Sequence, residues 1–226
     1  MERIFAIVPA AGSSTRMSSA VPKVLLPLGG ISIIRRSVEL LSEAVSISGM
    51  AVLAPENAKD LITQELQDVS GSVYVMLGGD SRANSVRVGV NFLMEHYRPS
   101  PEDLVVVHDA ARCLCSKDLV RSVIDEARLT GCAVAAVPIA DTLVRANNGE
   151  RVSEYVNRDG MWAIQTPQVF KFNIIEKALE RGYPGATDES SQVFPFHSVN
   201  LVLGERSNIK ITYPEDYDLA NAIILK

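Results

Sequence analysis

The chain has 226 residues, of which 47% are hydrophobic and 22% are charged, and its formal net charge is −5. This size and apolar content suffice for one large domain with a buried core. The acidic balance argues against nucleic acid or an anionic membrane as a partner, and no apolar run is long enough to span a bilayer. Three cysteines form no disulfide framework, so we expect a cytoplasmic protein, or one from an organelle interior after removal of a transit peptide.

Short apolar runs alternate with amphipathic stretches along most of the chain. Strands are predicted at Phe5–Pro9, Met50–Ala54, Ser72–Met76, Leu104–Val107, Ala133–Pro138 and Val199–Leu203, and helices at Ser32–Ala44, Asn57–Leu66, Ala83–His96 and Lys117–Leu129. Runs rich in Val, Ile and Ala, separated by helices, are typical of a parallel sheet that is buried on both faces. The sequence therefore predicts an α/β fold with a doubly wound, mainly parallel, Rossmann-like sheet.

Two later segments depart from this alternation. The stretch Asp141–Arg158 is polar and has a turn signal at Asn147-Asn148-Gly149, which predicts a β-hairpin arm protruding from the main sheet. A final helix is predicted from Pro214 to Ile224, because proline is well tolerated in the first helical turn.

Ligands bind at the carboxyl ends of the strands in such sheets, so the loop after the first strand is a candidate site. It reads Pro9-Ala10-Ala11-Gly12-Ser13-Ser14-Thr15-Arg16-Met17 and is followed by Pro22-Lys23. Small residues allow backbone N–H groups to approach an anion, and Arg16 and Lys23 add positive charge for phosphate oxygens. The loop is neither a Walker A motif nor a dinucleotide fingerprint. A tight turn with two solvated basic residues is the alternative.

A second glycine-containing loop, Gly78-Gly79-Asp80-Ser81-Arg82, leads to Ser85 in the next predicted helix. Its two glycines would free the backbone to meet the edge of a base, while Asp80 and Ser85 offer selective hydrogen-bonding groups. The alternative is a simple turn in which Asp80 and Ser81 cap the helix.

An acid follows the apolar strand Leu104–Val107, in the motif His108-Asp109-Ala110-Ala111-Arg112. A carboxylate at a buried strand end needs a partner, which could be a divalent cation or Arg112. Further along, Lys210 stands in a predicted short strand, Asn208–Thr212, where a neighbouring phosphate would explain it. An Asp109–Arg112 ion pair and a solvated edge lysine are the alternatives.

Taken together, these motifs resemble the methylerythritol-phosphate cytidylyltransferase family. The resemblance runs from residue 9 to residue 216 and also includes Asp141-Thr142, Asn157-Arg158, Thr166-Pro167-Gln168, Thr187-Asp188-Glu189 and Pro214-Glu215-Asp216. The first loop is shared by many sugar nucleotidyltransferases, whereas the combination is far more specific. Two positions depart from the family pattern. Cys113 stands where a proline is usual, and Asn157 stands where an aspartate is usual.

The resemblance implies one nucleotidyltransferase domain over residues 1–226, with the hairpin arm at about 141–158. The implied reaction transfers CMP from CTP to 2-C-methyl-D-erythritol 4-phosphate, with Mg²⁺ as cofactor. It assigns catalysis to Arg16, Lys23, Arg158 and Lys210, and nucleotide binding to Ala10, Ala11, Gly12, Gly78, Gly79, Asp80 and Ser85. Asp109, Arg112, Thr142, Arg158 and Lys210 would bind the sugar-alcohol phosphate, and Asp109 would also hold the metal. The family's homodimer implies that the arms carrying Thr142 and Arg158 are exchanged between subunits.

Other functions compete with this one. A ribitol-5-phosphate cytidylyltransferase would share the fold, CTP and chemistry, although Pro9-Ala10-Ala11-Gly12 is closer to the methylerythritol enzymes than to the Leu-Ala-Gly-Gly of the ribitol enzymes. A sugar-1-phosphate nucleotidyltransferase that uses UTP or GTP fits the whole motif set less well. A non-catalytic nucleotide-binding module belongs to a different class. Release of pyrophosphate would distinguish an enzyme from such a module.

Overall fold

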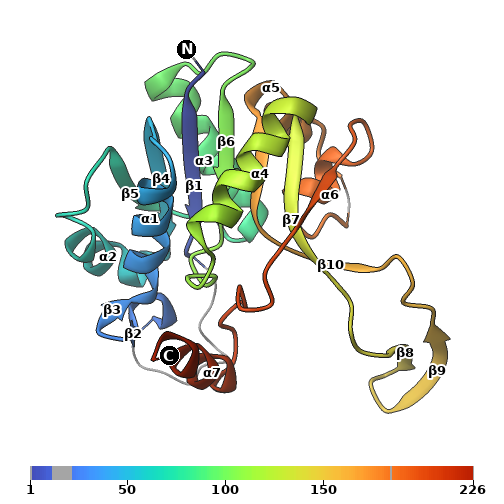
Figure 1. Cartoon of the computed structure of the whole chain (residues 1–226). Helices are drawn as coiled ribbons and strands as arrows, with labels where there is room; N and C mark the ends of the chain where they lie inside the picture. The colour runs from blue at the N-terminus through green and yellow to red at the C-terminus, as the bar shows by residue number, and fades with distance from the viewer. Residues whose placement is uncertain (1, 12–21, 184, 226) are drawn as a thin grey trace.

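A seven-stranded sheet forms the centre of the computed structural model, which describes residues 2–11, 22–183 and 185–225 (Figure 1). The strand order is β11–β7–β10–β6–β1–β4–β5. These strands are β1 (Ile4–Pro9), β4 (Gly49–Ala54), β5 (Val73–Leu77), β6 (Leu104–Val107), β7 (Cys132–Pro138), β10 (Trp162–Lys171) and β11 (Asn200–Leu203). β10 runs antiparallel to both of its neighbours, and the other neighbouring pairs are parallel. The predicted mainly parallel α/β sheet is therefore confirmed.

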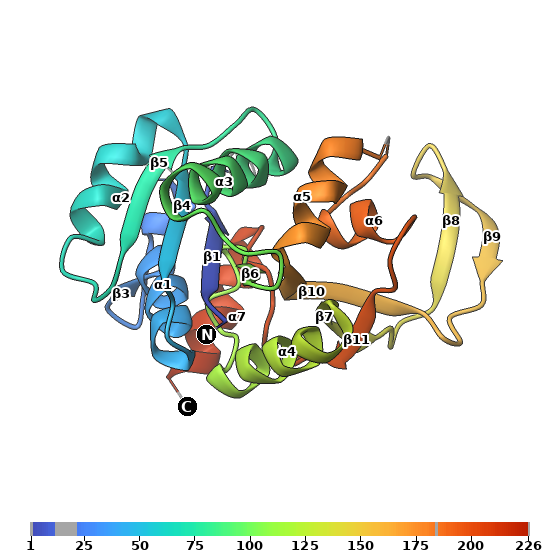
Figure 2. The ribbon, with the colours of Figure 1, turned by 90° about the horizontal axis from the view of Figure 1, so that it is seen from above.

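Helices cover both faces of this sheet (Figure 2). The helices are α1 (Ile33–Ala44), α2 (Lys59–Glu65), α3 (Arg82–Tyr97), α4 (Lys117–Thr130), α5 (Phe172–Arg181), α6 (Glu189–Val193) and α7 (Pro214–Ile224). Buried side chains of α1, α2 and α4 share one core cluster, and those of α3, α5 and α6 share another. The arrangement is thus doubly wound, as predicted.

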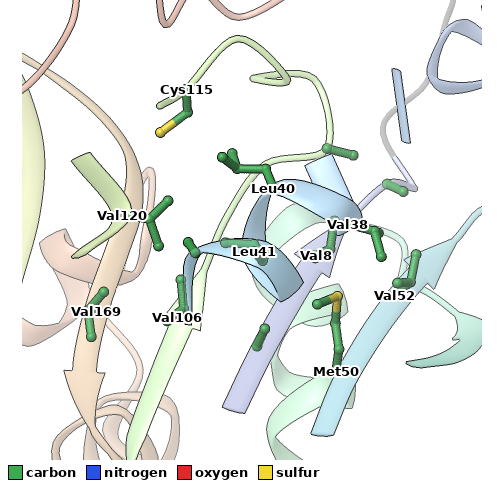
Figure 3. Packing of buried hydrophobic residues seen from close by; sticks show 14 of the residues in the cluster. Val8, Val38, Leu40, Leu41, Met50, Val52, Val106, Cys115, Val120 and Val169 are labelled. Atoms are coloured by element: carbon green, nitrogen blue, oxygen red, sulfur yellow. The ribbon is translucent and has the colours of Figure 1, made fainter. Parts of the chain in front are cut away.

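The central strand β1 shows why two cores form. Phe5 and Ile7 belong to the cluster on one face, whereas Ala6 and Val8 belong to the cluster on the other, because successive side chains of a strand point to opposite faces. All four side chains are fully buried. Figure 3 shows the cluster that contains Val8, in which this residue and neighbouring strand residues pack against α1. This rigid layer holds the loops that follow the strands.

The predicted hairpin is present as β8 (Leu143–Asn147) and β9 (Arg151–Val156), which pair antiparallel. Asn148 and Gly149 have φ angles of 52° and 76°, the left-handed conformation that a tight hairpin turn requires. The hairpin projects from the body of the molecule in Figure 1.

Other elements differ from the prediction. Strand β10, helices α5 and α6, two short 3₁₀ helices (Lys23–Leu25 and Glu56–Ala58) and the small pair β2 (Pro27–Leu28) with β3 (Ile31–Ser32) were not predicted. The prediction of a short strand at Asn208–Thr212 is wrong. The N–H of Ile211 donates to the carbonyl of Ala111, but the N–H of Thr212 donates to the Asp216 carboxylate, so no ladder continues. None of the helices in the described ranges is long and apolar enough to cross a membrane.

Candidate active site

A cavity of about 370 Å³ opens at the carboxyl ends of β1, β5 and β6. Three loops and the segment before α7 supply its walls, as expected for a sheet of this kind. The lining residues are Pro9, Ala10, Ala11, Lys23, Val24, Gly79, Asp80, Ser81, Arg82, Ser85, Asp109, Ala111, Lys210 and Thr212. Eight predicted site residues therefore meet in one place, although they are spread over 200 positions from Ala10 to Lys210.

Asp109 is the electrostatic centre of this cavity. Its Oδ1 atom lies 2.9 Å from Nε of Arg82, and its Oδ2 atom lies 2.6 Å from Nζ of Lys210. Burial alone would raise the pKa of Asp109, but the charges of Arg82 and Lys210 outweigh it and hold the pKa well below its usual range. Asp109 is therefore ionised at neutral pH, with one cation on each oxygen.

A buried polar chain fixes the backbone of Asp109. Its N–H donates to Oγ1 of Thr166 at 3.0 Å, and Oγ1 lies 3.2 Å from Nδ1 of His108. The other ring nitrogen of His108 lies 3.2 Å from the carbonyl of Arg112. Burial lowers the pKa of His108 to about 4, so the ring is neutral. Nε2 then carries the proton and donates to Arg112, while Thr166 donates to Nδ1 and accepts from Asp109.

The glycine loop after β5 is closely packed. A Cβ on Gly78 would lie 2.6 Å from Cβ of Ala11 and 2.8 Å from Oγ of Ser85. The N–H of Gly79 donates to Oγ of Ser85 at 3.1 Å, and the same hydroxyl donates to the carbonyl of Ser81. Asp80 accepts a hydrogen bond from the amide of Asn84. Gly78 thus allows the β5 loop to touch the β1 loop, and Gly79 allows it to pack against α3, where an added Cβ would lie 2.5 Å from Cβ of Asn84.

The first loop contributes Ala10 and Ala11 to the cavity wall. Nζ of Lys23 also reaches the cavity and donates to the carbonyl of Ile211 at 2.8 Å. This contact links the start of the chain to the segment that carries Lys210. The predicted residues Gly12 and Arg16 lie outside the described residues.

Three predicted substrate-binding residues do not line this cavity. Arg112 is turned toward the segment before α7, where its Nη1 donates to the carbonyl of Asn208 at 2.7 Å, and burial lowers its pKa. Thr142 and Arg158 lie at the base of the hairpin arm, and Arg158 donates to the carbonyl of Ala140. Within the single chain, the structure therefore does not bring Arg112, Thr142 and Arg158 to the cavity.

The sequence did not single out Arg82 as a site residue, nor Glu189, which contacts Arg82. Nη1 of Arg82 lies 2.6 Å from Oε2 of Glu189, whose side chain is 1% exposed. The signal for Arg82 was its position beside the glycine loop. Glu189 is 107 residues away along the chain, and its motif Thr187-Asp188-Glu189 entered the family resemblance without a role being assigned to it.

A divalent cation would find few protein ligands here. The parts of the chain that the structure describes contain no group of three or more His, Cys, Asp or Glu side chains that could hold a metal. Asp109 and Asp80 are the acids among the lining residues. Mg²⁺ commonly binds one or two carboxylates and takes its other ligands from phosphate oxygens and water, so this donor set fits a cation that arrives with a nucleotide triphosphate.

Comparisons with known proteins give one consistent result. Residues 4–226 match the family model for 2-C-methyl-D-erythritol 4-phosphate cytidylyltransferase. A protein of that name from Laribacter hongkongensis is 37% identical over 228 residues, which cover 99% of this chain and 97% of the relative. A bifunctional IspD/IspF enzyme from Granulibacter bethesdensis is 40% identical over 95% of this chain, which spans 54% of that longer protein.

Solved structures agree with these relatives. A crystal structure of 4-diphosphocytidyl-2C-methyl-D-erythritol synthase has a TM-score of 0.85 and 28% identity, with 99% of this chain and all of that chain covered. The 2-C-methyl-D-erythritol 4-phosphate cytidylyltransferase of Thermus thermophilus has a TM-score of 0.79 and 29% identity, with both chains covered in full.

Proposed function

The chain belongs to the 2-C-methyl-D-erythritol 4-phosphate cytidylyltransferase family, and we propose that it transfers CMP from CTP to that acceptor. The products are 4-diphosphocytidyl-2-C-methyl-D-erythritol and pyrophosphate. The observation that carries this proposal is the cavity itself, which combines a closely packed glycine loop with the cations Lys23, Arg82 and Lys210 around one ionised acid, Asp109.

The proposed reaction needs no covalent intermediate with the protein. An oxygen of the acceptor phosphate attacks the α-phosphorus of CTP, the new P–O bond forms, and the bond to the β-phosphate bridge breaks to release pyrophosphate. Catalysis then depends on holding both anions in line and on stabilising the charge that develops. The basic side chains at the cavity suit this task, since each offers N–H donors with a permanent positive charge.

We assign roles to individual residues on this basis. The backbone of Ala10, Ala11 and Gly12 would face the phosphates of CTP, and Arg16 and Lys23 would stabilise the transition state and the leaving pyrophosphate. The loop with Gly78, Gly79, Asp80 and Ser85 would read cytosine. The presence of Gly79, Asp80 and Ser85 together in the cavity wall supports this assignment.

Asp109 would hold Mg²⁺ together with the phosphates of CTP, and the bound cation would neutralise phosphate charge. Lys210 would then orient the acceptor phosphate. Both oxygens of Asp109 are ion-paired in the protein alone, so binding of substrate and metal has to rearrange the contact with Lys210. The 43% exposure of the Lys210 side chain leaves it room to move.

The hairpin arm supports a homodimer with exchanged arms. Val144, Val152 and Tyr155 of the arm are exposed by 44%, 52% and 75%, so the described residues leave an apolar surface on this projection uncovered. In such a dimer, Thr142 and Arg158 would bind the acceptor at the partner's cavity. When Arg158→Ala and Lys210→Ala subunits are mixed in equal amounts and reassociate at random, about half of the dimers contain one subunit of each kind. One of the two sites in each mixed dimer is then intact, so about a quarter of wild-type activity should return. No recovery would oppose the exchange of arms.

We also place the protein in the cytoplasm. Cys113, Cys115 and Cys132 are all buried free thiols, which fits a reducing compartment.

The function is tested by magnesium-dependent release of pyrophosphate from CTP, with 2-C-methyl-D-erythritol 4-phosphate and ribitol 5-phosphate as separate acceptors. We expect release with the first acceptor only. Release with ribitol 5-phosphate alone would keep the chemistry and replace the acceptor. Binding of CTP without release in either reaction would favour a nucleotide-binding module.

A further inference from the structure

Glu189 is a buried acid behind the cavity wall that has no role in the proposed chemistry. Its Oε2 atom lies 2.6 Å from Nη1 of Arg82, and its Oε1 atom has no hydrogen-bond partner among the described residues. Burial raises the pKa of Glu189, although the charge of Arg82 opposes this. Burying a carboxylate with one hydrogen-bonded oxygen costs free energy of folding, so the contact with Arg82 calls for an explanation.

Helix α6 does not need the Glu189 side chain for its own placement. Asp188 caps the helix by accepting from the N–H of Ser191, and the side chain of Ser191 completes a capping box. Gln168 of β10 adds two further contacts, donating to Asp188 at 2.8 Å and accepting from the N–H of Ser190. Since buried ion pairs are often no more stabilising than apolar residues of similar size, stability is a weak explanation for Glu189.

The contact has a clear effect on Arg82 instead. The guanidinium lies between two acids, with Nε on Asp109 and Nη1 on Glu189. Its Nη2 group makes no hydrogen bond to a described residue, and the side chain lines the cavity with 25% exposure. Two anchors at different nitrogens fix the plane of the group. Without Glu189, the guanidinium could rotate to bind both oxygens of Asp109, and it would then compete with Lys210.

We propose that Glu189 is a positioning residue that acts through Arg82. It holds Arg82 on a single oxygen of Asp109, keeps the second oxygen for Lys210 or a bound cation, and leaves the remaining N–H groups of Arg82 for a substrate phosphate. This inference rests on the proposed function, because its consequence is a change in cytidylyl transfer.

A double-mutant cycle tests whether the effect passes through Arg82. The variants are Glu189→Leu, Glu189→Gln, Arg82→Ala and the double variant Arg82→Ala/Glu189→Leu. Glu189→Leu should lower kcat/KM by about 10- to 100-fold, as loss of outer-shell partners does at metal sites. Its melting temperature should also fall, because one partner of a buried ion pair is removed, so activity is measured well below that temperature. Glu189→Gln keeps an oxygen that accepts from Arg82 and should recover most of this loss. The double variant should match Arg82→Ala alone.

A matched control lies at the other end of β6. Asp103 is 2% exposed and pairs with Arg3 at 2.8 Å, so it is an equally buried acid in an acid–arginine pair. Asp103→Asn should lower the melting temperature but leave kcat/KM close to the wild-type value when both are measured well below that temperature. The proposal would be overturned if Glu189→Leu lowered the melting temperature but left kcat/KM of the folded protein unchanged, as expected for this control. It would also be overturned if the losses of kcat/KM in Arg82→Ala and Glu189→Leu were additive in the double variant.

A second readout does not depend on turnover. The Nη1 protons of Arg82, which donate to Glu189, should exchange slowly with solvent in ¹H–¹⁵N NMR spectra of the wild type and of Glu189→Gln, and faster in Glu189→Leu. Rapid exchange in the wild type would overturn the inference even if Glu189→Leu did not fold. A wild-type protein that shows slow exchange but no cytidylyl transfer would instead refute the proposed function and leave the positioning contact standing.

Discussion

Replacing Asp109 with asparagine removes the one negative charge that separates two cations at the cavity. In the wild type, Arg82 and Lys210 donate to different oxygens of Asp109, at 2.9 and 2.6 Å. An asparagine side chain has one oxygen that can accept from one of these cations, and its NH₂ group must then face the donors of the other. The nearly isosteric substitution therefore creates a donor–donor conflict as well as a loss of charge.

The expected loss of stability follows from the burial of the three side chains. Breaking a buried ion pair by removing one partner costs about 3–5 kcal/mol. Here the cost lies at the low end, since Arg82 keeps its contact with Glu189 and the Lys210 side chain, 43% exposed, can turn to solvent. A loss of about 3 kcal/mol corresponds to a fall in melting temperature of about 6–12 °C for a chain of this size. Activity should fall by about 10²- to 10³-fold.

The difference in unfolding free energy between wild type and Asp109→Asn should depend on pH in a definite direction. Because the pKa of Asp109 is lowered in the folded protein, its ionised form contributes stability above the unfolded pKa, and this stability is lost as the pH falls toward the folded value. The difference in unfolding free energy between wild type and Asp109→Asn should be constant from about pH 5 to 8 and should shrink below about pH 4. Denaturant unfolding without divalent cations measures it. A difference below about 0.5 kcal/mol, which is typical of an ordinary surface substitution, or one that grows as the pH falls, would refute the reasoning.

Three further predictions concern other parts of the site. Lys23→Ala and Arg16→Ala should fold normally and lose about 3–4 kcal/mol of transition-state stabilisation in pyrophosphate-release assays; normal turnover in either variant would contradict its role. Gly78→Ala places a methyl group 2.6 Å from Cβ of Ala11, so the KM for CTP should rise at least about tenfold while the protein still folds, and an unchanged KM would show that the loop yields easily. The pKa of His108 is lowered to about 4, so the neutral ring contributes stability above about pH 6.5 that is lost on acidification to pH 4. Replacing His108 with Gln should reduce the fall in unfolding free energy between these pH values. An unchanged fall would show that another group titrates.

Much of the sheet could be predicted because its strands are continuous apolar runs. Strand β6 begins at Leu104 and ends at Val107, as predicted, since all four of its residues are buried and polar residues follow at once. Strand β10 was missed for a physical reason. Pro167 lies inside it, and proline normally argues against a strand because it cannot donate to the ladder. The structure places it at a shift in the register of β10 with β7, between Ile164 and Gln168, where the ladder is interrupted.

The site was predictable where chemistry follows directly from a strand end. Asp109, the glycine loop and Lys23 all stand at loops that the carboxyl-end rule selects. The link from Glu189 to Arg82 depends on side-chain packing between helices that are far apart in sequence, so the motifs that contain these two residues do not show that they touch. The segment around Lys210 was predicted at the right place with the wrong backbone, because alternating Ile209, Lys210 and Ile211 resemble a strand although only isolated backbone bonds hold them.

The most direct test of the proposed function is ³¹P NMR of a reaction that contains CTP, Mg²⁺ and equal amounts of 2-C-methyl-D-erythritol 4-phosphate and ribitol 5-phosphate. We predict that the methylerythritol phosphate signal alone disappears, and that paired signals of a new diphosphate diester and equimolar pyrophosphate appear. Consumption of ribitol 5-phosphate, or CTP that stays intact beside both acceptors, would contradict it.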